Sequence, residues 1–154
     1  MARDEQLLRE RTVVAELRFS SDPRLMKVLR AVIQFFAQQV GFGDADATNL
    51  MLAADEACTN IIRHGYAGRS DESIYVRVES LSDRIDILFE DTGVPMPMEQ
   101  LKPRPAPCEE GELKPGGLGT YLISCIMDRV SYTSEAGPGN RLHLVKYRSE
   151  EHRT

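Results

Sequence analysis

The sequence predicts an α+β fold: a two-layer α/β sandwich in which a mostly antiparallel, mixed sheet carries its helices on one face. One observation is the order of the predicted elements, which is strand, two helices, two strands, a long loop, a helix and two strands. Another is that most neighbouring strands are separated by short polar turns, which is typical of antiparallel hairpins. Because the helices come in blocks, they are expected to form one layer against the sheet.

The first strand and the first helix are predicted from a change in hydrophobic period. Residues 12–20 alternate polar and apolar side chains as a strand does. The apolar candidates of this strand are Val14, Leu17 and Phe19. Ser21 or Asp22 followed by Pro23 is typical of a helix start, and the helical spacing that follows ends near Gly41. The apolar positions of this helix are Leu25, Val28, Leu29, Ile33 and Phe36.

A second helix follows directly. Asp44 or Asp46 is expected to cap its start, because a carboxylate there accepts hydrogen bonds from unpaired backbone N–H groups. The helix is expected to stop by Gly65 or Gly68. Its apolar stripe is predicted to contain Leu50, Ala53, Ala54, Ala57 and Ile61.

The C-terminal half combines two hairpins with a long loop and a third helix. The predicted strands are residues 74–80, 84–91, 129–135 and 140–148, paired as two antiparallel hairpins. Residues 92–117 contain six prolines and no regular period. A loop of this length inside a compact domain is usually functional, which suggests a lid. Helical periodicity returns over residues 118–128.

The composition indicates a cytoplasmic globular domain. The 154 residues suit one domain, predicted to span residues 10–148 with flexible ends at 1–9 and 149–154. A net charge of −5 argues against sequence-independent binding to nucleic acid. No apolar run approaches the ~20 residues that span a bilayer, and the charged N-terminus lacks the apolar core of a signal peptide. We therefore expect neither a nucleic-acid nor a membrane partner.

The three cysteines, Cys58, Cys108 and Cys125, do not predict a metal site, because no Cys-x-x-Cys or Cys/His spacing is present. Cys58 and Cys125 fall within apolar helical stretches. We expect both to be buried structural thiols.

The second predicted helix carries a carboxylate and an amide one turn apart. Glu56 and Asn60 lie on the flank of its apolar stripe, so both can converge on one ligand. The amide oxygen of Asn60 suits Mg²⁺, which takes few protein ligands and fills its shell with phosphate oxygens and water. Glu56 can orient or deprotonate a hydroxyl that attacks a phosphate. The alternative for this pair alone is an ordinary solvated helix flank.

Two glycine-bearing turns supply further candidates. Asp91 ends a predicted strand with Gly93 two residues on. A carboxylate there can accept from an adenine amino group, and a glycine lets the backbone approach a flat base. Before the third helix, the glycines form an anion cradle of backbone N–H groups at a positive helix end. The candidates in that cradle are Gly116, Gly117, Gly119 and Thr120. A plain turn and a plain helix cap are the alternatives.

In this order the motifs carry a resemblance to a known family. The chain resembles the Bergerat-fold ATP-binding superfamily of histidine kinases, type II topoisomerases and certain chaperones, and within it the anti-sigma-factor serine/threonine kinases. The matching segments are ADEACTNIIRHGY for the N box, DTGVPM and GGLGTYLISCIMDRVSY for the two glycine boxes, and GNRLHLVK for the last strand. The resemblance covers residues 10–148.

By position, this resemblance implies that Asn60 is the Mg²⁺ ligand, Glu56 the general base and Asp91 the adenine-binding carboxylate. It also implies nucleotide contacts from Gly93, Gly117 and Gly119. His64, at the end of the second helix, is expected to be structural. Departures from the family pattern are the extra prolines of the lid and its acidic pair, Glu109 and Glu110.

The resemblance implies ATP and Mg²⁺ as cofactors and an antagonist protein of the anti-anti-sigma type as the phosphorylated partner. A sigma factor and a second copy of the chain are further candidate partners, with Val28, Phe35 and Phe36 as candidate contacts. Two alternatives stay open. One is a non-catalytic ATP-binding interaction module in bacterial signalling, and the other is a scaffold domain with accidental motif matches.

Overall fold

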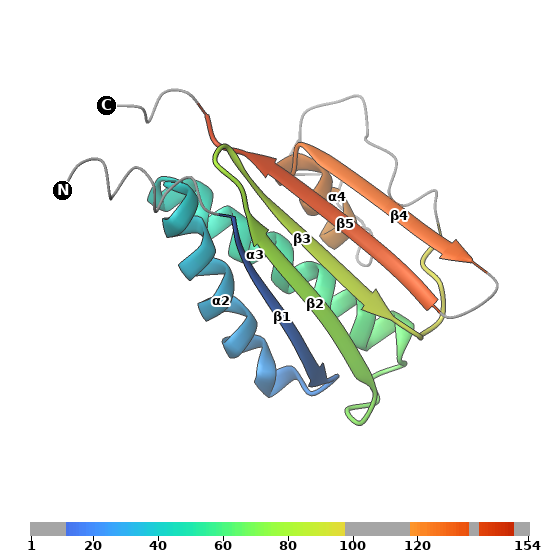
Figure 1. The fold of residues 1–154 in the computed structure, drawn as a ribbon. Coiled ribbons are helices and arrows are strands. Elements are labelled where there is room, and N and C mark those ends of the chain that lie inside the picture. The colour runs from blue at the N-terminus through green and yellow to red at the C-terminus, as the bar shows by residue number, and fades with distance from the viewer. Residues whose placement is uncertain (1–11, 98–117, 136–138, 150–154) are drawn as a thin grey trace.

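The computed structural model describes residues 12–97, 118–135 and 139–149, which form two layers, a sheet and the helices that cover one of its faces (Figure 1). The strands are β1 (Val13–Ser20), β2 (Ser73–Ser80), β3 (Arg84–Asp91), β4 (Arg129–Glu135) and β5 (Gly139–Tyr147). Their order in the five-stranded sheet is β1-β2-β3-β5-β4, and all four pairings are antiparallel. The predicted α+β, two-layer fold with a mostly antiparallel sheet is confirmed.

The helices follow the predicted order. They are η1 (Pro23–Leu25), α2 (Met26–Val40), α3 (Asp44–Asn60), the π-helical turn η2 (Ile61–Gly65) and α4 (Leu118–Ile126). Asp22 caps η1 as expected, because its side chain accepts a 2.9 Å hydrogen bond from the backbone N–H of Arg24. Gly41 ends α2 in the left-handed region, at φ 89°. The expected cap of α3 is wrong: Gly43 is the N-cap residue, and Asp44 and Asp46 lie in the first turn. There, their charges still complement the helix dipole.

Alternation along the strands decides which side chains enter the core. On β2, Ile74, Val76 and Val78 are fully buried, and the residues between them are partly exposed. On β1 the inward positions are the odd-numbered ones, so Val14, one of the apolar candidates of this strand, is 43% exposed. Because side chains on a strand alternate between faces, Val14 cannot share a face with Leu17 and Phe19.

The core lies between the inner face of the sheet and helices α2, α3 and α4. All five residues of the predicted stripe of the second helix, Leu50, Ala53, Ala54, Ala57 and Ile61, are buried. Phe89 of β3 and Leu29 of α2 meet this stripe in the same apolar cluster. Burial of each large apolar side chain contributes about 1.5–3 kcal/mol. This packing fixes α3 against β3, and with it the geometry at the ends of both elements.

The two described cysteines differ in exposure. Cys58 is buried in α3, and burial raises the pKa of its thiol to about 12. Cys125 is exposed, so the prediction of a second buried thiol is wrong. Ile123 and Met127 are the buried residues around it, which shows that α4 turns another side to the core. Cys108 lies outside the described residues.

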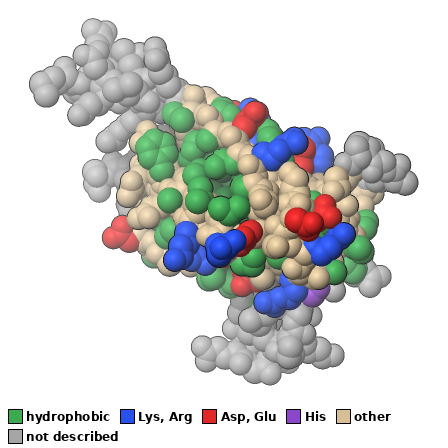
Figure 2. Space-filling model, turned by 90° about the horizontal axis from the view of Figure 1, so that it is seen from below, with side chains coloured by type: hydrophobic (Ala, Val, Ile, Leu, Met, Phe, Trp, Pro, Cys, Tyr) green, Lys and Arg blue, Asp and Glu red, His purple; other side chains and the backbone are tan. Residues whose placement is uncertain are grey.

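Part of the surface is apolar. Val28 and Phe35 on α2 are 49% and 50% exposed, whereas Phe36, a third predicted contact, is buried. Figure 2 shows hydrophobic side chains gathered in a patch, with lysine and arginine side chains beside it.

In the part of the chain that the structure describes, no helix is both long and apolar enough to cross a membrane.

Candidate functional site

A cavity of about 290 Å³ opens where the C-terminal end of α3 meets the C-terminal end of β3. Its polar side chains are Asn60, His64, Asp91 and Tyr132. Its apolar walls come from Ile61, Val94, Met96 and Leu142, together with Pro95 and Pro97. An apolar cleft with a few convergent polar groups is the usual form of a small-molecule site.

The helical side of the cavity is shaped by a change in helix type. After Asn60 the chain winds as a π-helical turn, in which the N–H of Tyr66 bonds to the carbonyl of Ile61 at 2.9 Å. Such wide turns are frequent at functional sites. The side chain of Tyr66 is 1% exposed. Its hydroxyl donates to the carbonyl of Ser73 at 2.6 Å and accepts from the N–H of Thr92 at 2.9 Å, which fastens the helix end to the end of β3.

Two glycines let the helix end and the turn after β3 touch. A methyl carbon placed on Gly93 would lie 2.5 Å from both the carbonyl carbon and the carbonyl oxygen of Gly65. The next N–H, that of Val94, donates to this same oxygen at 2.8 Å. Gly93 was predicted because a base can approach it. The structure gives a second reason for a glycine at this position, because the backbone of Gly65 occupies the space that a side chain on residue 93 would need.

Asp91 is held by two donors on a single oxygen. Its Oδ1 accepts from the N–H of Gly93 and from Nδ2 of Asn140, both at 2.9 Å. Nδ2 of Asn140 also donates to the carbonyl of Gly93 at 2.9 Å. Burial raises the pKa of Asp91, and these two hydrogen bonds oppose the rise. Within the described part of the chain Oδ1 accepts both bonds, so Oδ2 is left to accept from a ligand.

The predicted carboxylate–amide pair divides between the cavity and the helix flank. Asn60 lines the cavity, as does Asp91. Glu56 is half-buried on α3 one turn earlier and is not among the lining residues. The role of Glu56 stays a prediction.

The predicted phosphate cradle is described only in part. Gly116 and Gly117 lie outside the described residues. Gly119 and Thr120 lie in the first turn of α4, which packs against α3. Their proposed contacts to phosphate stay predictions.

Three residues of the site were not predicted to contribute to it. His64, expected to be structural, is exposed and lines the cavity. Tyr66 and Asn140 hold the two turns that form the site. Asn140 pairs directly with Asp91 across β3 and β5. The sequence offered one hint of this pairing, because a glycine in a strand often marks a place where another backbone approaches closely, and Gly139 directly precedes Asn140.

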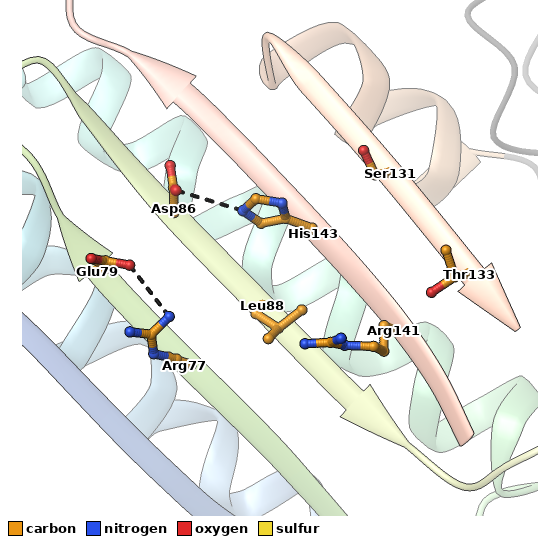
Figure 3. Close-up of a pocket in the computed structure, with 8 residues that line it drawn as sticks. All are labelled: Arg77, Glu79, Asp86, Leu88, Ser131, Thr133, Arg141 and His143. Atoms are coloured by element: carbon orange, nitrogen blue, oxygen red, sulfur yellow. Dashed lines mark ion pairs between the residues drawn. The ribbon is translucent and has the colours of Figure 1, made fainter. Parts of the chain in front are cut away.

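A second hollow lies on the outer face of the sheet, opposite the helices (Figure 3). It has a volume of about 360 Å³ and lies over Leu88, which pairs with Arg77 on one side and His143 on the other. The cations of this hollow are paired with carboxylates, Arg77 with Glu79 at 3.4 Å among them. It contains none of the predicted site residues.

Comparison with known proteins identifies a family for this chain. A family model for the histidine kinase-like ATPase domain matches residues 19–146. The chain belongs to this family. Membership in the histidine kinase-like ATPase family makes the chain a nucleotide-using domain and confirms the predicted superfamily.

Similar curated proteins narrow the comparison. The serine-protein kinase RsbW of Bacillus pumilus is 29% identical over 150 residues, which are 94% of this chain and 91% of that protein. RsbW of Bacillus velezensis is 29% identical over 79% of each chain. RsbW of Listeria innocua is 28% identical over 88% of this chain and 87% of its own. These relatives confirm the predicted resemblance to the serine/threonine kinase group.

Proposed function

We propose that this protein is an ATP-dependent serine/threonine protein kinase that acts as a partner-switch regulator. In this role it phosphorylates a small antagonist protein, with a sigma factor and a second copy of the chain as further candidate partners, in the cytoplasm. The observation that carries the proposal is that Asn60 and Asp91, on separate elements, line one cavity. The similarity to serine-protein kinases over most of the chain supports the reaction type.

The cavity suits the adenosine part of ATP. Oδ2 of Asp91 accepts a hydrogen bond from the adenine amino group, and the walls at Ile61, Met96 and Leu142 cover the faces of the ring. A volume of about 290 Å³ is close to the usual size of a small-molecule site. In this proposal the adenosine part lies in the cavity and the phosphates extend beyond it.

The residues at the cavity also fit Mg²⁺. A neutral amide oxygen is a hard ligand, and Asn60, which lines the cavity, has one. The described part of the chain contains no cluster of three acidic, histidine or cysteine side chains that would hold a metal alone. This agrees with an ion held largely by phosphate oxygens and water. When bound, Mg²⁺ neutralises charge on the phosphates.

Glu56 is assigned as the general base. Its carboxylate accepts the proton of a serine or threonine hydroxyl on the partner protein, whose oxygen then bonds to the γ-phosphorus as ADP leaves. The half-buried position of Glu56, outside the cavity, is where a partner's side chain can arrive. The base thus lies on the same helix face as Asn60, one turn away.

The test is phosphotransfer from labelled ATP and Mg²⁺ to an antagonist protein encoded nearby. Glu56→Gln is expected to reduce transfer by ~10²-fold or more while ATP binding survives. Glu79→Gln is the matched control, because that glutamate lies on the outer face of the sheet. Equal transfer by wild type and Glu56→Gln would rule out the base assignment. ATP binding without transfer to any partner would favour the second candidate, a non-catalytic interaction module.

The adenine assignment has its own test. Asp91→Asn is expected to weaken ATP binding by about tenfold or more, because one charge-assisted hydrogen bond is lost. Isothermal titration calorimetry measures the change. Unchanged affinity would remove Asp91 from the nucleotide site.

A further inference from the structure

We propose that Asn140 is a positioning residue for the nucleotide: it holds the Asp91 carboxylate in one orientation, with Oδ1 occupied and Oδ2 presented to the cavity. The inference rests on the proposed nucleotide binding and adds a residue to it. Asn140 is 3% exposed and does not itself line the cavity. It therefore acts through Asp91.

The geometry of Asn140 leaves it little freedom. It lies directly across from Asp91 in the β3–β5 pairing. Its Nδ2 spans two acceptors, Oδ1 of Asp91 and the carbonyl of Gly93, each at 2.9 Å. One amide group thus ties the carboxylate to the backbone of the turn that follows it. A rotation of the carboxylate would break the bond from Asn140 and the bond from the N–H of Gly93 together.

Backbone packing beside Asn140 fixes the pair further. Gly139 has φ +135°, and a methyl carbon there would lie 2.5 Å from the carbonyl oxygen of Asp91. Only a glycine allows the start of β5 to come this close to the end of β3. The close approach brings the amide of Asn140 within hydrogen-bonding distance of the carboxylate.

A carboxylate oriented in this way selects the base that it meets. Oδ1 already accepts from two donors, so Oδ2 is the atom of Asp91 that can accept from a ligand. The ionised carboxylate has no hydrogen to donate. A purine with an amino group at this position completes the arrangement, whereas a purine with a carbonyl there opposes two acceptors. Asn140 therefore contributes to discrimination as well as to affinity.

Asn140 also influences the ionisation of Asp91. The bond from Nδ2 lowers the pKa of Asp91 against the rise caused by burial. The other titratable groups at this cavity are Tyr132 on β4 and His64 in the π-helical turn. A variant that lacks His64 therefore separates any contribution of this side chain from that of Asp91.

The experiment is calorimetric titration of the full chain with ATP and with GTP between pH 5 and 8, each also in a His64→Gln background. Asn140→Leu removes the donor at similar volume, and Asn140→Thr keeps a hydroxyl donor. For Asn140→Leu we expect about tenfold weaker ATP binding at pH 7.5 and a smaller preference for ATP over GTP. As the pH is lowered, this variant should lose binding at a higher pH than wild type, because the hydrogen bond that lowers the pKa of Asp91 is gone. Asn140→Thr should recover part of each effect.

Arg141→Ala is the matched control, since its side chain lies on the outer face of the sheet (Figure 3). It should bind as wild type does. If Asn140→Leu keeps the wild-type pH profile and ATP preference and loses only thermal stability, the positioning role is overturned. If wild type itself binds no adenine nucleotide, the proposed function fails at its first step, which is a distinct result. A folded Asn140→Thr keeps the question answerable should Asn140→Leu not fold.

Discussion

Replacement of Gly93 by alanine tests the close contact on which the site is built. The added methyl carbon would lie 2.5 Å from the carbonyl carbon and oxygen of Gly65 and 2.8 Å from its Cα. Carbon atoms in contact prefer a separation of about 3.5–4 Å, so the two backbones must part by roughly 1 Å. The neighbours are main-chain atoms on both sides, and they cannot rotate away as a side chain would.

The cost can be worked from two contributions. Overpacking of this kind costs about 1–3 kcal/mol. The 2.8 Å hydrogen bond from the N–H of Val94 to the carbonyl of Gly65 runs across the same contact, and its loss costs about 1 kcal/mol more. The free energy of unfolding should therefore fall by about 3 kcal/mol. ATP affinity should fall as well, because Asp91 and Asn60 lie on the two parts that separate.

Urea denaturation measures the stability loss, and calorimetry with ATP measures the affinity. Gly65→Ala is the matched control: its methyl carbon would meet Oδ1 of Asp91 at 3.6 Å and Cα of Gly93 at 3.8 Å, which is ordinary contact. Its unfolding free energy should stay within about 1 kcal/mol of wild type. If Gly93→Ala unfolds at the wild-type urea concentration, the proposed reason for this glycine is wrong.

Other expected outcomes concern stability and reactivity around the site. Tyr66→Phe should lower the free energy of unfolding in urea by about 1–3 kcal/mol, because the N–H of Thr92 loses its acceptor in a part-buried place; no loss would contradict the fastening role. Burial raises the pKa of Asp91, so its charge costs folding free energy at neutral pH. Without nucleotide, Asp91→Asn should therefore have a higher melting temperature than wild type at pH 7.5. The difference in melting temperature should shrink as the pH is lowered toward 3.8, the ordinary pKa of the carboxyl group. In native protein, mapped alkylation at pH 8 should label Cys125 and leave Cys58 unmodified until denaturant is added, because burial raises the pKa of Cys58 to about 12; equal labelling would refute its burial.

Much of the fold followed from local patterns. The alternation of β3 and the polar turn before it predicted residues 84–91, and the structure places this strand at Arg84–Asp91. Periodicity also predicted the buried stripe of α3. Local patterns misled at two places. Gly43, not Asp44, is the N-cap residue of α3, and Val14 lies on the outer face of β1 because the inward positions of that strand are the odd-numbered ones.

The candidate site, too, was predicted from the sequence only in part. Asn60, Asp91 and Gly93 were named from their residue types and from short motifs, each of which covers a few neighbouring positions. The placement of Asn60 and Asp91 on one cavity agrees with that prediction. The roles of Glu56 and of the glycines before α4 depend on bound phosphate and stay predictions.

By itself the sequence determined the elements, the two hairpins and the residue types of the site, because these depend on neighbours along the chain. The tertiary structure decided that β5 lies between β3 and β4. That order sets Asn140 opposite Asp91 and lets Gly139 approach the carbonyl of Asp91. Strand order is fixed by how the sheet packs on its helices, through contacts between distant parts of the chain, and no local pattern encodes it. The orientation of the Asp91 carboxylate is a consequence of that packing.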